Sequence, residues 1–299
     1  MLKKVGRIRL SSERQRDPWT TSWDAHDASG APLLVRIGKL PVTLDAASAA
    51  RFDADAARAG ERGGALLPVV EHGVSFSMPW VAHPALDGRP LGAWVAERGP
   101  LAKDVLATEL LALVGADVAE ALAAAHEGEP ALVHGAVGLD TIWIDAEGAR
   151  GRLVGVALAR VCLEAGRAVP PLRVARAAFA SPEQARDEPI GPASDVYSLA
   201  AALAARGRRA GRRRSASRIA RRATLPRARA RGRSRACARR GPGGATEQVR
   251  ALTAALRGFV GSRARRRGAP RAPPSGAPRR RRGLRRARTP LRSGSRSTR

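Results

Sequence analysis

The sequence predicts an α+β protein in which a small strand-rich part is followed by a mainly helical part. Three observations lead to this prediction. Short apolar segments separated by turn residues dominate the chain up to residue 87. A long segment with apolar residues three and four apart begins near Lys103. After Arg206 this pattern ends, and arginine, alanine, glycine and proline take its place.

Several strands and one helix are predicted in the first part. Polar turns interrupt the apolar residues between 6 and 40, and the segment PLLVRIGKL at 32–40 has the composition of a buried strand. Alanine, aspartate and arginine dominate residues 46–60, which predicts a helix. Two further apolar runs, at 66–73 and 76–86, predict another pair of strands.

Helices and one hairpin are predicted in the second part. From Lys103 to His126 leucine and valine recur at helical spacing, and alanine fills much of the rest, which predicts a long helix. Apolar segments at 141–144 and 153–158 are separated by turn residues and predict a hairpin. One apolar face along residues 192–205 predicts a second buried helix.

The charge of the chain is divided unevenly along its length. Residues 1–205 carry 21 lysines and arginines and 25 acids, whereas residues 206–299 carry 33 arginines and a single acid, Glu247. The second composition offers too few large apolar residues to offset chain entropy and predicts disorder, except for a helix at 245–260. We therefore expect three regions, at 7–87, 88–205 and 206–299.

Cysteine content and hydropathy limit the class of protein. Cys162 and Cys237 supply neither a disulfide framework nor a zinc site. We find no signal peptide and no run of about 18 apolar residues that would predict a membrane-spanning helix. The expectation is a cytoplasmic protein without membrane contact.

The stretch 131–144, ALVHGAVGLDTIWI, resembles the catalytic loop of eukaryotic-type Ser/Thr protein kinases. The family pattern is His-Arg-Asp-Leu-Lys-Pro-x-Asn followed by apolar residues. His134 and the apolar end are kept, but Ala136 stands at the position of the aspartate base. Gly138 stands at the position of the lysine, and Thr141 at that of the magnesium-binding asparagine. The resemblance implies a kinase-like loop that lacks its catalytic side chains.

Further motifs extend the resemblance over residues 7–205. Pro182 and Glu183 lie in the segment SPEQ, which resembles the family's Ala-Pro-Glu motif, and the segment SDVYSL at 194–199 resembles its buried helix. Weaker matches at the strand lysine, the helix glutamate and the start of the Asp-Phe-Gly motif fall on Arg36, Asp55 and Gly155. The resemblance implies a protein-kinase-like two-lobe fold with a small β-rich lobe and a truncated helical lobe, followed by the arginine-rich tail that the composition predicts to be disordered.

Phosphoryl transfer in this family needs a glycine-rich loop over the phosphates, a lysine and magnesium ligands. The stretch 15–20, QRDPWT, has no glycine, and Arg36 is a longer and planar substitute for lysine. Gly155 and Thr141 offer magnesium neither a carboxylate nor an amide. We therefore expect a non-catalytic pseudokinase without a cofactor, in which ATP and magnesium bind only if a vestigial site at Arg36 and Asp55 still accepts them.

Several of these positions also have structural interpretations. Arg36 paired with Asp55 could hold a phosphate, or the two could form a half-exposed surface ion pair worth under about 1 kcal/mol. The resemblance implies that His134 packs under the loop and that Asp195 accepts backbone N–H bonds from the loop. It also implies that His83 replaces the residue that guards the back of the nucleotide pocket.

Three functional interpretations follow. A pseudokinase would act, if at all, by binding a protein partner of unknown identity. The arginine-rich region 206–299 predicts instead a non-specific contact with a polyanion such as nucleic acid. Because all its basic residues are arginine and it begins abruptly inside the helix that starts at Pro192, the same region also has the character of an out-of-frame translation. The chain would then be a frameshifted remnant of a Ser/Thr protein kinase.

Overall fold

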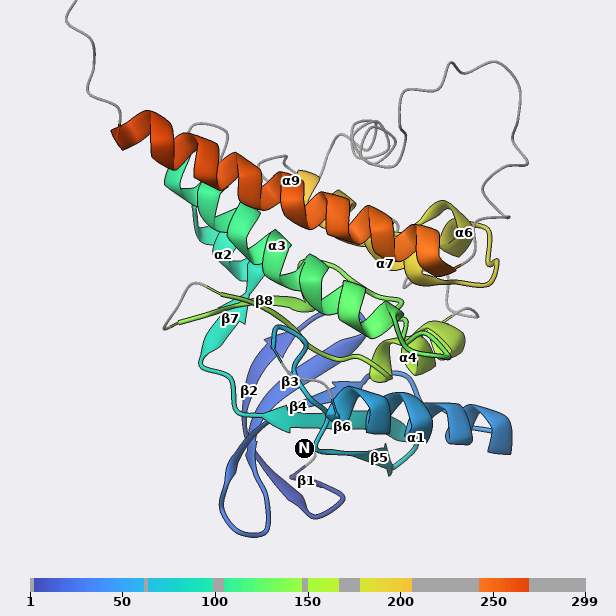
Figure 1. The fold of residues 1–299 in the computed structure, drawn as a ribbon. Coiled ribbons are helices and arrows are strands. Elements are labelled where there is room, and N and C mark those ends of the chain that lie inside the picture. Colours follow the sequence, from blue (N-terminus) through green and yellow to red (C-terminus); the bar gives the residue numbers. More distant parts are fainter. Residues whose placement is uncertain are drawn as a thin grey trace, which may run out of the picture.

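The computed structural model describes residues 3–61, 64–98, 105–146, 150–166, 178–205 and 242–268. Within these ranges the chain forms a small lobe of strands with one helix, and a larger lobe made mainly of helices (Figure 1). Helix α9, Pro242–Gly268, lies along the outer side of the helical lobe. The predicted α+β class with two unlike lobes is confirmed.

The small lobe is built on a six-stranded antiparallel sheet in the order β1-β2-β3-β4-β6-β5. Its strands are β1 Lys4–Val5, β2 Ile8–Arg16, β3 Thr20–His26, β4 Pro32–Gly38, β5 Glu71–Ser75 and β6 Met78–Pro84. Side chains on one face, among them Val5, Ile8 and Trp80, form a buried cluster. The strands predicted between 6 and 40 are present.

Helix α1, Ala46–Gly60, lies beside this sheet (Figure 1). The Asp45 side chain caps its first turn by accepting a hydrogen bond from Ser48 N. Phe52 and Ala56 are buried one helical turn apart, which fixes the face that packs inward. The helix predicted at 46–60 is confirmed with the same bounds.

The strand predicted at 66–73 has the wrong bounds. Its first residues contact β9, Gly151–Leu153, of a second sheet, where Leu67 N donates to Leu153 O at 2.9 Å. Pro68 follows, which has no N–H to donate, and β5 begins only at Glu71. The first residues of this apolar run contact β9 of one sheet, and its last residues form part of β5 in the other. Composition alone does not show this division.

The helical lobe surrounds helix α3, Val105–His126. Its other elements are α2 Leu91–Arg98, α4 Leu158–Gly166, α6 Pro182–Ala185, α7 Pro192–Ala204, β7 Gly88–Pro90, β8 Ile142–Asp145 and β9. The helices predicted at 103–126 and 192–205 are confirmed, with small differences at their ends. Among the described residues, no helix combines the length and the apolar character that crossing a bilayer requires.

Part of the hairpin predicted at 141–144 and 153–158 is wrong. Strands β8 and β9 do pair, but β9 ends at Leu153, and α4 begins at Leu158. All residues from Leu153 to Leu158 except glycine are apolar and buried. A short run that is buried on every side has no periodicity to distinguish strand from helix.

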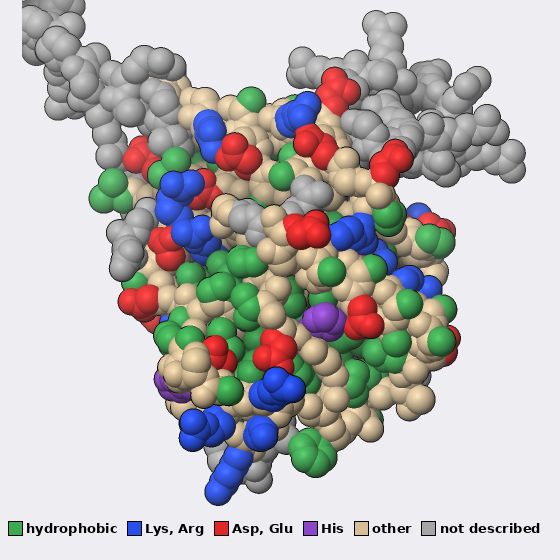
Figure 2. Space-filling view, turned by 60° about the horizontal axis from the view of Figure 1, so that its bottom comes forward, with side chains coloured by type: hydrophobic (Ala, Val, Ile, Leu, Met, Phe, Trp, Pro, Cys, Tyr) green, Lys and Arg blue, Asp and Glu red, His purple; other side chains and the backbone are tan. Residues whose placement is uncertain are grey.

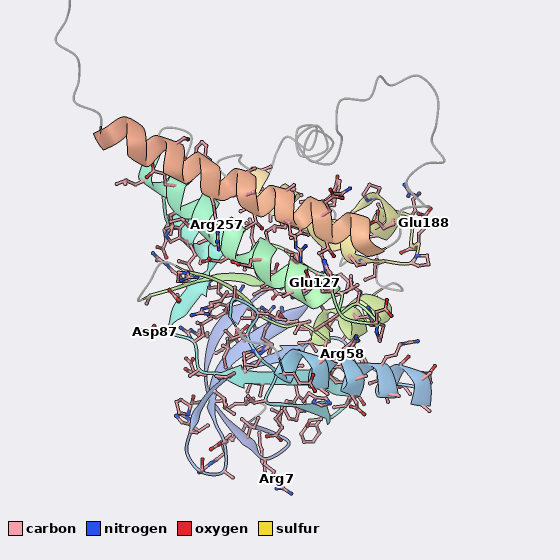
Figure 3. The ribbon with its side chains drawn as sticks, viewed as in Figure 1. Arg7, Arg58, Asp87, Glu127, Glu188 and Arg257 are labelled. Atoms are coloured by element: carbon pink, nitrogen blue, oxygen red, sulfur yellow. The ribbon has the colours of Figure 1, made fainter. Side chains whose placement is uncertain are left out.

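Helix α9 packs antiparallel on α3 and contains the helix predicted at 245–260. Arg250 pairs with Glu127, and Arg257 pairs with Glu120 at 2.5 Å, so that two ion pairs join the helices two turns apart. Figure 3 labels Glu127 on α3 and Arg257 on α9. Val249 is fully buried between them. Although the sequence placed this helix in a separate tail, it packs on the helical lobe; the other residues of 206–299 lie outside the described ranges.

We expect Val249→Ala to lower the free energy of unfolding by about 2 kcal/mol, because it removes two buried methyl groups. Arg250→Ala on the same helix should cost under about 1 kcal/mol, because its ion pair is exposed. Urea denaturation of both variants measures these values. An equal, negligible effect of the two substitutions would contradict the docking of α9 on α3.

Candidate functional site

The two lobes meet at a buried apolar cluster to which both contribute. Leu34 of β4 and Leu67 come from the small lobe, Leu86 from the connection between the lobes, and Trp143 and Val154 from the helical lobe. Leu34, Trp143 and Val154 are completely buried. In the kinase family the glycine-rich loop covers the nucleotide phosphates at this junction. In this chain the junction also holds this apolar cluster.

Arg14 of β2 joins the lobes at the same junction. Its Nη1 donates to Leu86 O at 2.5 Å, and its Nη2 donates to Gly88 O at 2.7 Å. The guanidinium also lies over the Trp143 ring, with Cζ 5.1 Å from the ring centroid, within range of a cation–π contact. Arg14 was not singled out in the sequence, and Trp143 was noted there only as part of the apolar end of the loop, because neither lies at a position that carries phosphate chemistry in the family.

The turn between β2 and β3 holds a carboxylate on its own backbone amides. Asp17 Oδ1 accepts hydrogen bonds from Trp19 N and Thr20 N, each at 2.8 Å. Thr20 Oγ1 donates to Asp17 Oδ2 at 2.5 Å. This turn falls within the stretch that the resemblance matches to the family's glycine-rich loop. Its Asp17 carboxylate accepts the N–H groups that an open loop would present to a phosphate.

Arg36 of β4 is buried beside this turn, and its side chain is only 1% exposed. Its Nη2 pairs with Asp17 Oδ2 at 2.9 Å and donates to Thr20 Oγ1 at 2.6 Å. Its Nη1 donates to Asp140 O at 2.9 Å, and Trp143 Nε1 donates to the same carbonyl at 3.3 Å. Arg36 therefore connects the β2–β3 turn of the small lobe to the catalytic-loop segment of the helical lobe.

The electrostatics of the Arg36–Asp17 pair favour an ionised carboxylate. Burial raises the pKa of Asp17, but the Arg36 charge and the hydrogen bonds from Thr20 and Trp19 lower it more. The pKa of Asp17 therefore lies below its ordinary value. A buried positive charge is thus matched by a buried negative charge that the same lobe supplies.

The predicted pairing of Arg36 with Asp55 is wrong, and so is its interpretation as a half-exposed surface pair. Asp55 on α1 pairs with Arg58 at 2.5 Å and with Arg160 of α4 at 3.4 Å (Figure 3 labels Arg58). Arg36 pairs with Asp17 instead, because the β2–β3 turn folds over β4 and places the Asp17 carboxylate beside the guanidinium. Among the described residues, no ion pair or hydrogen bond joins Arg36 to Asp55.

The segment that resembles the catalytic loop is held by its own hydrogen bonds. Thr141 Oγ1 accepts from Gly138 N at 2.9 Å and donates to Ala136 O at 3.0 Å. His134 Nε2 donates to Val154 O at 3.1 Å, and Nδ1 accepts from Ala136 N at 3.2 Å. His134 is buried under the loop, as the resemblance implied. The Thr141 hydroxyl is engaged inside the loop.

Asp195 of α7 fixes this loop from below. Its carboxylate accepts from His134 N at 2.8 Å and from Gly135 N at 2.7 Å. His126, at the end of α3, lies 3.0 Å from the same carboxylate through Nε2. The implied role of Asp195 as an acceptor of loop N–H bonds is confirmed. His126 was not singled out in the sequence, because its contact with Asp195 spans 69 residues of chain.

Pro182 and Glu183 begin the short helix α6. Pro182 follows the N-cap Ser181, and Gln184 completes a capping box with that serine. Glu183 Oε1 accepts a hydrogen bond from Ser194 Oγ at 2.5 Å. Gln184 Nε2 donates to Gly135 O at 2.6 Å. This motif therefore supports the catalytic-loop segment through hydrogen bonds.

His83 of β6 is buried against Gly155, the residue at the start of the Asp-Phe-Gly position. Its Nδ1 donates to Pro68 O at 2.8 Å, and its Nε2 accepts from Gly155 N at 3.1 Å, as a neutral imidazole does. Burial lowers the pKa of His83 to about 4, and the nearby Arg36 charge acts in the same direction. A Cβ added to Gly155 (φ +84°) would lie 3.2 Å from Arg36 Nε.

The neutral His83 predicts a loss of stability in acid. Its pKa in the folded chain, about 4, lies below the ordinary 6.5, so the unfolded chain binds more protons between these values. The free energy of unfolding should therefore be highest above pH 6.5 and fall by about 3 kcal/mol as the pH decreases to 4. Urea denaturation across this range should show the fall in the unchanged chain and in His72→Gln, and a smaller fall in His83→Gln. If the free energy of unfolding fell equally with pH in all three proteins, the buried neutral state of His83 would be contradicted.

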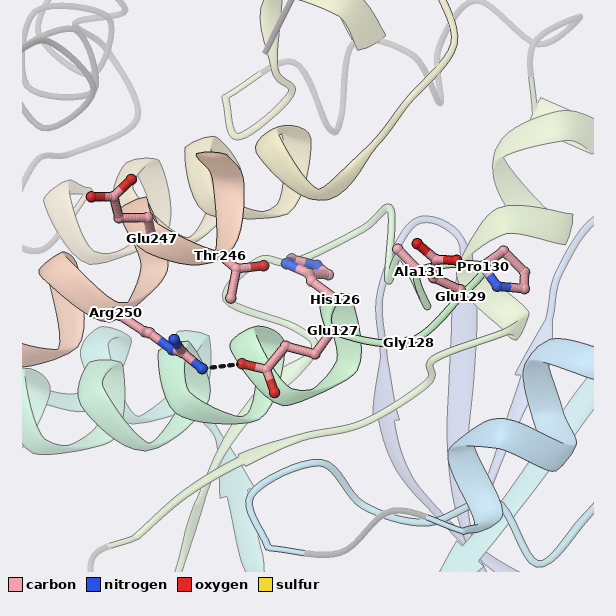
Figure 4. A pocket seen from close by; sticks show the side chains of 9 residues that line it. All are labelled: His126, Glu127, Gly128, Glu129, Pro130, Ala131, Thr246, Glu247 and Arg250. Atoms are coloured by element: carbon pink, nitrogen blue, oxygen red, sulfur yellow. Dashed lines mark hydrogen bonds and ion pairs between the residues drawn. The ribbon is translucent and has the colours of Figure 1, made fainter. Parts of the chain in front are cut away.

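A cavity of about 870 Å³ lies elsewhere, between the end of α3 and the start of α9 (Figure 4). Its lining comprises His126, Glu127, Gly128, Glu129, Pro130, Ala131, Thr246, Glu247 and Arg250. Arg250 and Glu127 form their ion pair at its edge. None of the residues predicted for nucleotide or metal binding lines it.

The sequence relatives of the chain are bacterial kinases. It is 30% identical over 205 residues to the probable serine/threonine-protein kinase PkwA of Thermomonospora curvata, which is 67% of this chain and 26% of that protein. It is 32% identical over 135 residues to the serine/threonine-protein kinase PknL of Mycobacterium tuberculosis, which is 45% of this chain and 32% of that protein. The chain thus spans about a quarter to a third of the length of these relatives. No protein-family model matches it.

Solved structures with the same fold are kinase domains. A double mutant of the PknI kinase domain of Mycobacterium tuberculosis superposes with a TM-score of 0.60 at 18% identity, over 86% of this chain and 97% of that one. Another structure of the PknI kinase domain gives a TM-score of 0.57 at 16% identity, over 86% and 99% of the two chains. At such identities the similarity shows the fold alone.

Proposed function

We propose that this chain, which is protein-kinase-like in its fold and in its sequence relatives, is a non-catalytic pseudokinase that acts by binding a partner. The observation that carries the proposal is the occupation of the lobe junction by the chain's own side chains. Trp143 and Arg14 pack beside the connection between the lobes. Asp17 and Arg36 supply both charges at the β2–β3 turn.

A magnesium nucleotide does not fit the residues at these positions. The amides of Trp19 and Thr20 already donate to Asp17, and the Arg36 guanidinium already pairs with the same carboxylate. Gly155 has no side chain, and the Thr141 hydroxyl is bonded inside its loop. Among the described residues, no group of three or more His, Cys, Asp or Glu side chains is placed to hold a metal. These contacts support the proposal that the chain does not carry out the reaction of the family.

The absence of a base supports the same proposal. Ala136 stands where the family's aspartate accepts the proton of the substrate hydroxyl, and it is buried without a heteroatom on its side chain. An active site would have to rebuild the base, the metal ligands and the phosphate loop together. We infer a role that needs the shape of the kinase fold rather than its chemistry.

ATP with magnesium is expected to leave the melting temperature of the chain unchanged, because a ligand that does not bind the folded state does not stabilise it. Thermal denaturation with increasing ATP and magnesium measures this, and an active Ser/Thr kinase serves as the positive control. A clear, saturable increase in melting temperature would overturn the proposed occupation of the junction. Radioactive γ-phosphate on a protein acceptor, lost on Arg36→Met, would overturn the pseudokinase proposal itself.

The partner is proposed to be a protein, whose identity the sequence does not specify. Arg14 and Arg36 both bridge the lobes, so the relative position of the lobes is fixed without a nucleotide. Such a preorganised surface binds with a smaller entropic cost than one that must close first. Cross-linking followed by mass spectrometry of the full chain would identify the protein that occupies it.

Two other interpretations stay open for region 206–299. Its 33 arginines favour non-specific binding of a polyanion, which would weaken steeply with salt. A frameshifted coding sequence is the other interpretation, and translation of the encoding DNA in the other two frames would test it. The packing of α9 on α3 favours in-frame coding of residues 242–268, because Arg250 and Arg257 face two matching glutamates.

A further inference from the structure

Two turns meet at the free end of the small lobe and form one surface, which we call the lobe tip: residues 3–9 together with 74–77. Gly6 N, in the turn between β1 and β2, donates to Ser75 Oγ at 3.2 Å. Trp80 Nε1 donates to the same hydroxyl at 3.0 Å. Trp80 lies in the same hairpin as Ser75 and fixes its hydroxyl, and the bond from Gly6 N joins the two turns as a single projecting surface. Arg7 marks its outermost part (Figure 3).

Phe76 has an unusual position at this tip. It is 81% exposed, and it occupies the two-residue turn between β5 and β6 with φ +53°, followed by Ser77 with φ +61°. Glycine and asparagine dominate such turns, because left-handed backbone is strained for a bulky residue. The exposed phenyl ring makes no compensating contribution to the core. Folding is therefore disfavoured by the backbone of Phe76 and gains nothing from its exposed ring.

The tip also carries a group of unpaired cations. Lys3, Lys4, Arg7 and Arg9 are exposed, and none of them forms an ion pair with a described residue. Val5 and Ile8 between them are buried in the core of the lobe, so the hairpin that carries the charges is anchored. Lysine and arginine side chains gather at the end of the lobe, beside isolated hydrophobic side chains (Figure 2).

We propose that the lobe tip binds the surface of an anionic lipid bilayer. Phe76, together with Val74, which is 45% exposed, would enter the boundary between headgroups and acyl chains. The four cations would contact the lipid phosphates around it. A projecting tip with one exposed aromatic residue among cations suits a deformable flat partner. Single-stranded nucleic acid requires a groove lined by several aromatic residues, which the tip lacks.

This proposal goes beyond the pseudokinase function and does not depend on it. The sequence predicted no membrane contact, and that expectation rested on the lack of a spanning segment. Binding at a bilayer surface requires only exposed apolar and cationic side chains. Each cation near an anionic membrane strengthens binding about fivefold.

Phe76→Trp in the full chain provides a probe of the tip. All five native tryptophans are buried, with exposures of 7% or less, so a water-soluble quencher such as iodide should reach mainly the new indole. With vesicles of phosphatidylcholine and phosphatidylglycerol, we expect the indole at position 76 to become protected from iodide. We also expect it to be quenched by brominated acyl chains. Vesicles of phosphatidylcholine alone should give little protection.

Two controls separate the tip from the arginine-rich region 206–299, which would itself attract anionic vesicles. Leu106→Trp places an indole at an exposed position in the helical lobe and should stay accessible to iodide on the same vesicles. Replacement of Lys4, Arg7 and Arg9 by glutamine in the Phe76→Trp chain should weaken the protection about fivefold for each cation removed. Loss of protection in this variant while the chain still sediments with vesicles assigns the effect to the tip.

Phe76→Asn supplies a test with opposite signs for folding and binding. Asparagine suits a left-handed turn, so the melting temperature of Phe76→Asn should stay equal or increase. Its competition with the Phe76→Trp chain for anionic vesicles should weaken. The proposal is overturned if the indole at position 76 stays accessible to iodide on anionic vesicles. Protection of that indole by single-stranded DNA but not by vesicles would also overturn it and would assign the tip to nucleic acid.

Discussion

Replacing Asp195 by alanine is expected to lower the free energy of unfolding by about 3–5 kcal/mol, because the change removes a buried carboxylate that three groups share. The carboxylate accepts from His134 N and Gly135 N and contacts His126 Nε2, all in the interior. Alanine would leave two loop N–H groups without an acceptor. Urea denaturation measures the cost, and hydrogen exchange at His134 and Gly135 reports whether the loop opens.

Asp53→Ala is the matched control for this substitution. The Asp53 side chain is 70% exposed, and among the described residues its ion pair is with His72, so its loss should cost under about 0.5 kcal/mol. Asp195→Asn should give an intermediate cost, because its amide oxygen can replace only one acceptor position. Equal stability of the Asp195→Ala and Asp53→Ala chains would show that Asp195 does not hold the loop.

Arg36→Met is expected to cost about 3–5 kcal/mol of unfolding free energy, since methionine keeps the approximate volume but leaves Asp17 as an unpaired buried charge. The substitution also removes the donor to Asp140 O and with it one bridge between the lobes. Chemical denaturation at neutral pH measures the loss. Arg250→Met, whose side chain is 70% exposed, should cost under about 1 kcal/mol and is the control.

A double-mutant cycle with Asp17→Asn tests whether the pair acts as a unit. The double variant should cost less than the sum of the two single substitutions, because the second change removes a charge that the first left without a partner. His83 provides an independent check: its pKa is lowered in part by the Arg36 charge and should increase towards 6.5 in Arg36→Met. Additive costs together with an unchanged His83 titration would refute the buried pair.

These predictions share one physical cause. At the β2–β3 turn the chain places a carboxylate on backbone amides and a guanidinium beside it, which are the charges that a phosphate and a lysine would bring. At the connection between the lobes, Arg14 donates to two carbonyl groups while it lies over Trp143. These polar groups are thus satisfied within the chain, as the proposed nucleotide-free pseudokinase requires.

Local sequence was sufficient to predict long elements that carry their apolar residues on one face. Helix α1 follows from a capping aspartate and apolar residues one turn apart, and α3 from 22 residues with few helix breakers. It was not sufficient where a short apolar run contacts several elements. Residues 66–73 divide between two sheets, and residues 153–158 change from strand to helix, because burial on all sides removes the periodic signal.

Motif resemblance was sufficient to predict the role of a residue where that role depends on the backbone of the fold. Asp195 accepts the loop N–H groups as implied, since that contact depends on how α7 packs under the loop. The resemblance failed for Arg36 and Asp55, which do not pair. A family pattern carries over partners only when the residue at both positions is kept, and here neither the lysine nor the glutamate is present.

The sequence by itself determined that the chain has a β-rich lobe and a helical lobe, and that Arg36, Ala136 and Gly155 stand at the positions that the kinase resemblance assigns to phosphoryl transfer. These properties follow from hydrophobic periodicity and from residue identity, which need no knowledge of distant contacts. Only the tertiary structure decided what stands at the lobe junction instead, and that α9 belongs to the helical lobe. Arg14 and Trp143 are 129 residues apart, and Arg36 and Asp140 are 104 apart. Such contacts depend on how the folded lobes meet. Two residues form a cation–π contact or a hydrogen bond because they are close in space, and their spacing along the chain does not reveal this.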